Sequence, residues 1–488
     1  MYPEFREIKA LCESGRYDLI PIKKELYADI KTSVEVLKVL KRADEHCFML
    51  ESVEDAQKWG RYTFLGFAPS MEITCRNGKV KVDGKTVKGN VGPDEVLRGV
   101  LARCRSPKLE HMPPFTGGLV GYFSYDYIQY NEPTLNLDAQ DEEMFNDMDV
   151  MLFDRLIVFD NFRQKIILIV NMLCNNFDEE YPKALEKLEE LEKLIRNGEA
   201  YQFQPLHLKS EFKPLFSEEE YCSMVQRAKD YIYEGDIFQV VLSNRLEAEM
   251  EGSLFDAYRV LRTTNPSPYM FYFSGEDMEI AGASPETLVK LQDDRLYTFP
   301  LAGTRPRGKT EEEDVALEKE LLDDEKELSE HNMLVDLGRN DIGRISRIGS
   351  VQVEKYLSIE RFSHVMHIGS TVSGCILDDC DAIDAIHSVL PAGTLSGAPK
   401  LRACEIINEL ENNKRGIYGG AVGYLDFAGN LDTCIAIRLA YAKNGKVFVR
   451  SGAGIVAHSQ PEREHRECIN KAKAVVNAIE LAQRRDEM

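Results

Sequence analysis

The sequence predicts an α+β fold of two lobes, in which helices cover mixed or antiparallel β-sheet. The chain has 488 residues and is 43% hydrophobic, which is enough for two or three average domains or for one large two-lobed protein. Short β-like runs occur along the whole chain with helical stretches between them, but without the regular rhythm of a parallel sheet. No internal repeat is visible.

The first lobe is predicted to span residues 1–200 and to be followed by a polar linker at 201–214. Its charged helix, Tyr181 to Arg196, precedes Asn197-Gly198, which is a typical helix end. Apolar runs bounded by polar residues predict its strands at Cys47 to Leu50, Tyr62 to Leu65, Lys79 to Val82, Arg155 to Phe159 and Lys165 to Val170.

The second lobe is predicted to span residues 215–488. It opens with a helix from Ser217 to Tyr233, which Glu234-Gly235 ends. Further helices are expected at Glu311 to Gly338, Ala398 to Glu411 and Pro461 to Arg484. The strands of this lobe are expected at Ile237 to Leu242, Met278 to Gly282, Leu288 to Leu291, Ile417 to Tyr424, Thr433 to Leu439 and Val447 to Arg450.

Composition excludes several classes of protein. The formal net charge of -22 and the lack of a Lys/Arg tract argue against nucleic acid as a ligand. No run of eighteen uncharged apolar residues predicts a membrane span, and the first residues lack the apolar core of a signal peptide. Eleven scattered cysteines without a C-x-x-C pair fit reduced thiols. The expected compartment is the cytoplasm.

The segment Pro300 to Gly308, PLAGTRPRG, has the composition of an anion-binding loop. Its glycines allow a close backbone approach and its two arginines offer forked donors for a carboxylate or phosphate. A surface turn whose arginines pair with Glu311, Glu312 and Glu313 is the alternative.

Two carboxylate pairs at helical spacing could supply oxygen ligands for Mg²⁺. Glu327 and Glu330 share one helix face, and Glu464 and Glu467 share another, with Lys471 one turn further along. Taken alone, either pair at this spacing is more often a solvated helix face.

A second group of segments could bind an anion. Pro391 to Lys400 places glycines, hydroxyls and a lysine before a helix, with Ser396 as the expected N-cap, although the Walker A order is absent. Arg438 is a lone cation in a predicted apolar strand, and a buried arginine needs either an anionic ligand or an internal salt bridge. Ser451 to Gly454 is a further place where backbone amides could approach a ligand.

Acid and base candidates are few. His367 could transfer protons, although a lone histidine is more often a core or surface residue. Glu286 follows a predicted strand among small residues, and Asn340-Asp341 is expected to form a tight turn. No residue stands out as a covalent nucleophile.

Taken together and in order, these segments resemble the chorismate-utilising enzymes, and most closely the members that make anthranilate. The resemblance spans about residues 230–480 and is joint, since each motif alone is weak. It rests on PLAGTRPRG, EKELSEHNMLVDLGRND, FSHVMH, GTLSGAPK, YGGAVGY, DTCIAIR, SGAGIV and HRECINKAKA. It implies a large α+β sandwich in which helices flank two β-sheets.

The resemblance also implies a set of ligand-binding residues. Glu330 and Glu467 would bind Mg²⁺, supported by Glu327 and Glu464, and the metal would hold the ring carboxylate of chorismate. The remaining substrate contacts would come from Gly303, Thr304, Thr394, Tyr418, Arg438, Gly452, Ala453, Gly454 and Lys471. Tryptophan would bind an allosteric site made by Glu51, Ser52, Pro268, Tyr269 and Met270.

The implied reaction is attack of ammonia at ring C2 with loss of the 4-hydroxyl, followed by elimination of pyruvate. Glu286 would protonate the departing hydroxyl and His367 would assist proton removal. Relatives that make aminodeoxychorismate have lysine at the position of Ala302, and those that use water have lysine at the position of Gln239. Since both lysines are missing, ammonia from a separate glutamine amidotransferase subunit is the expected nucleophile.

Two alternatives stay open. One is an enzyme that makes aminodeoxychorismate, whose product keeps the pyruvyl group until a lyase acts. The other is a catalytically silent subunit that binds tryptophan or chorismate for regulation. The complete set of Glu330, Glu467, His367 and Arg438 argues against the silent subunit.

Overall fold

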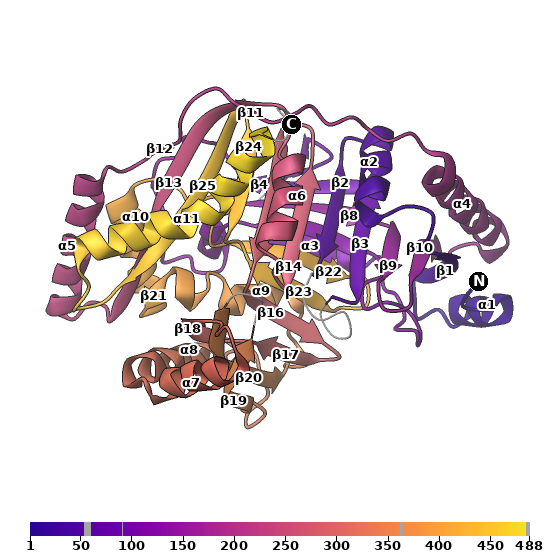
Figure 1. Ribbon diagram of the computed structural model, residues 1–488. Helices are drawn as coiled ribbons and strands as arrows, with labels where there is room; N and C mark the ends of the chain where they lie inside the picture. The colour runs from indigo at the N-terminus through magenta and orange to yellow at the C-terminus, as the bar shows by residue number, and fades with distance from the viewer. Residues whose placement is uncertain (53–59, 90, 362–364, 485–488) are drawn as a thin grey trace.

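Two large antiparallel β-sheets lie face to face between layers of helices in the computed structural model, which describes residues 1–52, 60–89, 91–361 and 365–484 (Figure 1). The predicted α+β sandwich with flanking helices is therefore confirmed.

The first sheet has 13 strands, and its order runs through both halves of the chain. Its path is β1 (Leu19–Tyr27), β10 (Lys165–Leu173), β9 (Arg155–Asp160), β3 (Tyr62–Phe67), β2 (Cys47–Glu51), β14 (Tyr269–Ser274), β15 (Met278–Ser284), β24 (Leu439–Lys443), β25 (Lys446–Ile455), β13 (Gln239–Glu251) and β11 (His207–Leu208). The short strands β12 (Lys213–Pro214) and β21 (Gly397–Ala398) also pair with β13.

The second sheet has 12 strands and also joins the two halves, through β22 and β7. Its path is β18 (Leu301–Pro306), β20 (Val365–Cys375), β17 (Arg295–Thr298), β16 (Thr287–Gln292), β23 (Leu431–Ile435), β22 (Ala421–Asp426), β7 (Gly118–Phe123), β8 (Met148–Phe153), β4 (Met71–Arg76), β5 (Lys79–Val82) and β6 (Lys85–Thr86). Strand β19 (Gln352–Arg361) pairs with β20.

The helices cover the outer faces of both sheets. One layer packs on the 13-stranded sheet through a shared apolar core: α1 (Phe5–Glu13), α2 (Ser33–Ala43), α4 (Phe177–Asn197), α6 (Phe255–Thr264) and α11 (Pro461–Arg484). Helices α3 (Pro93–Leu101) and α9 (Ala382–Val389) pack on the other sheet. The remaining helical segments are α5 (Glu218–Glu234), α7 (Glu311–Asp323), α8 (Glu325–Gly343), α10 (Lys400–Glu411), η1 (Tyr125–Tyr130) and η2 (Gly393–Leu395).

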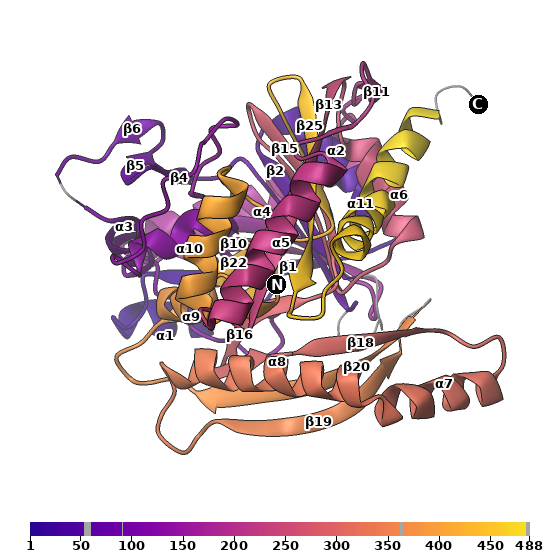
Figure 2. The same cartoon turned by 90° about the vertical axis from the view of Figure 1, so that its left-hand side faces the viewer.

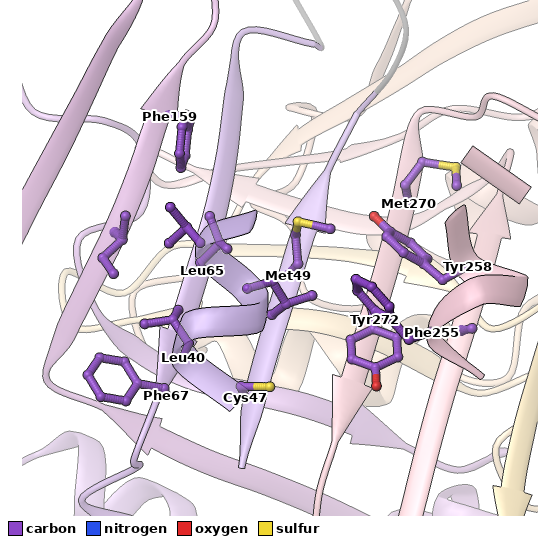
Figure 3. Close-up of a cluster of buried hydrophobic side chains, with 14 of the residues drawn as sticks. Leu40, Cys47, Met49, Leu65, Phe67, Phe159, Phe255, Tyr258, Met270 and Tyr272 are labelled. Atoms are coloured by element: carbon purple, nitrogen blue, oxygen red, sulfur yellow. The ribbon is translucent and has the colours of Figure 1, made fainter. Parts of the chain in front are cut away.

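Alternating side chains explain why the central strands are apolar throughout. In β2, Cys47 and Met49 point into the core under α2 and α6, which Figure 3 shows, while Phe48 points into the core between the sheets. In β10, Ile166 and Leu168 likewise face the helices. A strand covered on both faces gains from apolar residues at every position, so a continuous run replaces the alternating pattern.

The end of the 12-stranded sheet that contains β18 to β20 extends away from the stacked part at the bottom of Figures 1 and 2 and, with α7 and α8, forms the lower unit. Helix α8 packs along β18 and β20, and the β18 loop carries the first predicted anion-binding segment. The unit therefore brings the PLAGTRPRG segment and the first carboxylate pair onto adjoining elements.

Several predicted boundaries are correct. The helix Pro461–Arg484 and the strand Lys79–Val82 have the predicted limits. Ser217 caps α5 through a reciprocal capping box with Glu220, and Gly235 ends the helix in the left-handed conformation.

Other predicted boundaries are wrong for local reasons. The helix expected from Glu311 to Gly338 is broken at Asp324, whose carboxylate accepts the amides of Lys326 and Glu327 and starts α8. Asn340-Asp341 lies inside α8 rather than in a turn. The strand expected at Ile417 begins at Ala421.

The predicted strand Thr433 to Leu439 is also wrong, because the chain changes sheets there. β23 ends at Ile435 in one sheet and β24 begins at Leu439 in the other, with Arg438 between them at a left-handed φ of 53°. Ser396 is buried, its hydroxyl donates to the Ala392 carbonyl, and Pro399 precedes α10, so the predicted N-cap is corrected as well.

The two predicted lobes do not form separate sheets, and the predicted linker does not lie outside the sheets. Strands from residues 1–200 and from 215–488 share both sheets, and β11 and β12 of the 201–214 segment pair with β13. In the part of the chain that the structure describes, no helix has the length and hydrophobicity that crossing a membrane requires. All eleven cysteines are free thiols.

Candidate active site

The predicted ligand-binding residues form small groups that direct contacts join, on elements of the lower unit and of the stacked sheets. They come from the segments that follow β15 and β23, from the bulge of β18, and from β20, β25, η2, α8 and α11.

A β-bulge shapes the substrate side of the PLAGTRPRG segment. Ala302 pairs with Ile368 and Arg305 pairs with Met366, so Gly303 and Thr304 together oppose the single residue His367. Gly303 has a φ of 66°, which favours glycine at this position of a bulge. A Cβ on Gly303 would lie 3.2 Å from the Glu327 carboxylate and 2.9 Å from Leu321, so the bulge fits closely against α7 and α8.

His367 is fixed by the bulge that it opposes. Its Nδ1 donates to the Gly303 carbonyl at 2.8 Å and lies 3.1 Å from the Thr304 hydroxyl. Burial lowers the pKa of His367, the bond to Gly303 raises it, and the charge of Arg438 lowers it again. The ring is therefore neutral at neutral pH, and the proton on Nδ1 makes Nε2 the basic nitrogen.

Glu286 is a carboxylic acid in an apolar surrounding. Burial raises its pKa to about 7, against smaller opposite effects of the Thr394 hydroxyl and the Lys471 charge. The Thr394 hydroxyl donates to Glu286 Oε1 at 3.2 Å, and the Glu286 carbonyl accepts the Ile435 amide of β23. A proton is thus available on this side chain near neutral pH.

Arg438 and Tyr418 bring polar groups to the same side of the site. Arg438 keeps an exposed side chain although the surrounding protein lowers its pKa, and Tyr418 raises it. Within the described ranges Arg438 has no carboxylate partner, so the internal salt bridge considered for it is not formed there. Burial raises the pKa of Tyr418 well above its ordinary value, so its hydroxyl keeps its proton.

The Gly452 to Gly454 segment of β25 has room for backbone only. A Cβ on Gly452 would lie 2.7 Å from the Leu242 carbonyl and 3.0 Å from the Tyr418 hydroxyl. A Cβ on Gly454 would lie 2.9 Å from the side-chain nitrogen of Gln239, and Ala453 between them is fully buried. Lys471 of α11 donates to the Gly452 carbonyl at 3.2 Å.

The two carboxylate pairs lie on facing helices, α8 and α11. Partial burial raises the pKa of Glu330, and the charges of Glu327 and Glu467 raise it further. Burial raises the pKa of Glu464 too, with a further increase from Glu467. Glu467 pairs with Lys471 at 2.8 Å. Among the described residues no group of three or more acidic, histidine or cysteine side chains is arranged to hold a metal ion.

The two loop arginines fasten the loop. Arg305 bonds Glu320 at 3.0 Å and Asp324 at 2.9 Å, and Arg307 pairs with Asp314. The carboxylate partners are thus not Glu311, Glu312 and Glu313, although the surface-turn alternative was right about ion pairing. Ala302 is buried against this loop, with 8% of its surface exposed.

An open cavity of about 470 Å³ lies beside these residues. Its lining combines Arg438, Glu467 and Lys471 with three further polar residues of α11, which are Arg463, Arg466 and Asn470. Cations and amide donors therefore dominate the entrance of the site in an otherwise acidic protein.

The residues predicted for tryptophan lie together in another part of the molecule. Glu51 of β2 pairs in register with Met270 of β14, with Tyr269 one residue before it. The Glu51 carboxylate is already held by Tyr258 and by Arg262 of α6, at 2.5 Å and 2.6 Å. The Ser52 hydroxyl is buried without a hydrogen-bond partner in the described part of the chain. Pro268 directly precedes this strand.

Sequence reasoning missed several residues that support the site. His331 lies on the buried face of α8 and its Nε2 lies 2.7 Å from the Ser370 hydroxyl. Lys400 pairs with Asp341 at 3.0 Å, which joins the GTLSGAPK segment to α8. Arg415 is fully buried behind Tyr418, and its only sequence signal is a charge directly before an apolar run. The first three residues of FSHVMH lie outside the described residues.

Comparisons with known proteins agree with this geometry. The family described as chorismate binding enzyme matches residues 45–477. The anthranilate synthase component 1 of Acetivibrio thermocellus is 45% identical over 99% of both chains, and that of Aquifex aeolicus is 42% identical over 99% of this chain and 98% of its own.

Solved structures show the same relationship. The anthranilate synthase component I of Streptococcus pneumoniae matches with a TM-score of 0.74 and 40% identity over 87% of this chain and 93% of its own. The menaquinone-specific isochorismate synthase of Escherichia coli matches at 18% identity with a TM-score of 0.69 over 97% and 98% of the two chains, which shows a shared fold. The chain therefore belongs to the chorismate binding enzyme family and, within it, groups with the anthranilate synthase component 1 proteins.

Proposed function

We propose that this chain is component I of an anthranilate synthase, which converts chorismate and ammonia to anthranilate, pyruvate and water in tryptophan biosynthesis. The observation that carries the proposal is the identity of 42–45% to proteins of that name over almost the whole chain. The site chemistry supports it, because an acid, a neutral imidazole and two separate anchoring regions lie in one place.

The two anchoring regions suit the two carboxylates of chorismate. Arg438, Tyr418 and the amides around Gly452 to Gly454 would hold the enolpyruvyl carboxylate, with Lys471 beside them. Gly303, Thr304 and Thr394 would complete the pocket opposite.

Mg²⁺ is proposed to bind on the other side of the site through two carboxylates, with water or substrate oxygens in its other positions. Glu330 and Glu467 supply hard oxygen ligands, and their mutual repulsion with Glu327 and Glu464 is what a bound cation would relieve. Such an ion would supply a positive charge for the ring carboxylate of chorismate. Lys471 currently offsets part of the charge of Glu467.

Glu286 and His367 are assigned the proton transfers. In the first step the ammonia nitrogen bonds to ring C2, and the 4-hydroxyl leaves as water with the proton of Glu286. In the second step a base removes the C2 proton while the bond between ring C3 and the enolpyruvyl oxygen breaks, which leaves the aromatic amine, and the departing enolpyruvate takes up a proton at its methylene carbon to become pyruvate. With a pKa of about 7, about half of Glu286 carries a proton at pH 7, and the lowered pKa of His367 keeps the imidazole neutral there, as these roles require.

The nucleophile is assigned from two side chains, neither of which supplies an amine or a base for another nucleophile. Ala302 has no amine that could add to the ring. The Gln239 side chain lies over Gly454, and its amide is not a base that could activate water. Ammonia is therefore the proposed nucleophile, and a glutamine amidotransferase subunit is the proposed source.

Tryptophan is proposed as a feedback inhibitor that binds beside Ser52 and β14. The buried Ser52 hydroxyl would gain the hydrogen bond that the described residues do not give it. Tyr269 pairs in register with Ser284, and its hydroxyl lies 2.9 Å from the Thr287 hydroxyl, so it contacts residues on both sides of Glu286. A ligand that displaces β14 would thus disturb the proposed acid.

An assay with purified protein tests the proposal. Chorismate, Mg²⁺ and ammonium should give the fluorescence of anthranilate without an added lyase, and glutamine should replace ammonium only when an amidotransferase subunit is present. Formation of a product that fluoresces only after a lyase is added would assign aminodeoxychorismate instead. No turnover with either nitrogen source would support a silent subunit.

A further inference from the structure

A fully buried guanidinium lies behind the substrate-binding elements and contacts several of them. Arg415, between α10 and β22, is the largest side chain with less than 2% of its surface exposed. A charge buried this deeply has to be neutralised and hydrogen-bonded to be tolerated. Each of its three nitrogens accordingly donates to at least one defined acceptor.

One side of the guanidinium is neutralised by Glu411. Arg415 Nε donates to Glu411 Oε2 at 3.0 Å and Nη2 donates to Oε1, which is a bidentate pair. Glu411 in turn accepts the amide and the hydroxyl of Ser243 in β13, at 2.7 Å and 3.0 Å. Both members of the pair are 1% exposed, so the pair is not screened by solvent.

The other side of the guanidinium is directed at the site. Nη1 donates to the Leu395 carbonyl at 2.6 Å, and Leu395 directly follows Thr394, whose hydroxyl bonds Glu286. Nη2 donates to the Val241 carbonyl at 2.7 Å, and Val241 pairs in register with Gly454. The guanidinium therefore joins the Thr394 segment to the glycine strand.

Aromatic contacts add a third element. The Arg415 guanidinium lies 4.6 Å from the ring centre of Tyr125 and 5.9 Å from that of Tyr418. Both rings are therefore within the range of a cation–π contact with Arg415. The Tyr418 hydroxyl points toward Gly452, at the other end of the ring.

We infer that Arg415 is a positioning residue for substrate binding, which sets the relative placement of Thr394, Tyr418 and the Gly452–Gly454 backbone. Arg415 lies behind the proposed substrate-binding groups. It acts on them through two main-chain carbonyls and one aromatic ring. The inference rests on the proposed function for the identity of the substrate, chorismate, but its geometry does not depend on which nitrogen source reacts.

The chain offers a matched control. Arg450 is also buried, with 2% of its surface exposed, and lies 3.7 Å from the same Glu411 carboxylate. Arg450 donates to the Asn413 side chain and to the Lys414 carbonyl rather than to Leu395 or Val241. Lysine at either position keeps a positive charge beside Glu411. Only the substitution at position 415 removes the guanidinium that donates to both the Leu395 and Val241 carbonyls.

The test compares Arg415→Lys with Arg450→Lys by calorimetric titration with chorismate in the presence of Mg²⁺ and without ammonium, and by thermal unfolding. We expect Arg415→Lys to raise the Kd for chorismate by at least about tenfold. Arg450→Lys should change this Kd by no more than about twofold, at a similar loss of Tm. Equal Kd values for the two variants, or a loss of affinity that follows Tm in both, would overturn the inference.

A second variant covers the case in which Arg415→Lys does not fold. Glu411→Gln keeps an acceptor for Ser243 and removes the charge that holds Arg415, so it should weaken chorismate binding in the same direction by at least about threefold. An unchanged Kd in this variant would then refute the role. Failure of the proposed function gives another pattern, because the unaltered protein would bind chorismate but form no anthranilate with ammonium.

Discussion

At the scale of single residues, the pKa values of two side chains set the expected pH dependence of the reaction. Glu286 must carry a proton to act as an acid, so activity should fall as pH rises through its pKa of about 7. His367 must be neutral to act as a base, so activity should fall as pH drops below its lowered pKa. The kcat/KM for chorismate, measured at a constant concentration of free ammonia, should therefore follow a bell shape.

Substitution of Glu286 tests whether its deprotonation causes the loss of activity at alkaline pH. Glu286→Gln should lower kcat by about 100- to 10,000-fold and remove the alkaline limb, because the amide cannot protonate a leaving hydroxyl. A variant that keeps both turnover and the alkaline limb would show that another group is the acid.

The glycine strand gives a second prediction at this scale. Gly452→Ala should raise the KM for chorismate about 10- to 100-fold, because its Cβ would meet the Leu242 carbonyl and the Tyr418 hydroxyl. Gly99→Ala in α3, where a Cβ has open space, is the control and should leave KM unchanged. Steady-state kinetics of both variants distinguish a local steric effect from a general effect of glycine replacement.

At the scale of elements, the break between α7 and α8 decides where the first carboxylate pair lies. Asp324 accepts the amides of Lys326 and Glu327 and also pairs with Arg305 of the PLAGTRPRG segment. Asp324→Ala should lower the free energy of unfolding by about 1 kcal/mol, whereas Asp324→Asn should keep most of it because asparagine is an equally good cap. Chemical denaturation of the two variants measures the difference, and an equal loss would assign the stability to the ion pair instead.

The same elements show what the sequence could and could not predict. Ser217 and Gly235 delimit α5 by local chemistry, and that helix was predicted to within one residue. The break at Asp324 was missed because charged residues of high helix propensity surround it on both sides. The change of sheets at Arg438 was missed because apolar residues flank it, and only the two sheet partners determine that β23 ends before it.

At the scale of the whole molecule, the order of strands explains why motifs could predict the candidate site residues but not which of them lie close together. Residues 1–200 and 215–488 contribute to both sheets, and no local pattern predicts a contact between residues as distant in sequence as Glu286 and Thr394. The α+β class and many candidate residues could be predicted from sequence patterns, and the resemblance implied their roles, while supporting residues such as Arg415 and His331 depended on burial. The assignments of metal, substrate and tryptophan contacts stay predictions for experiment.

The tryptophan site gives a prediction that involves both halves of the chain. L-tryptophan should inhibit the enzyme and raise its Tm, because a ligand that binds only the folded protein stabilises it. Ser52→Ala should leave the Tm without ligand nearly unchanged, since it removes a hydroxyl that lacks a described partner, but it should remove the shift caused by tryptophan. A full tryptophan shift in this variant would place the site elsewhere.

The most direct test of the central claim is the fate of labelled ammonia. The unaltered protein should convert chorismate, Mg²⁺ and ¹⁵N-ammonium to equal amounts of pyruvate and anthranilate, with the label on the amine next to the carboxyl-bearing carbon. Nuclear magnetic resonance and mass spectrometry of the product locate that nitrogen. Label on a ring carbon opposite the carboxylate, with no release of pyruvate, would contradict the claim.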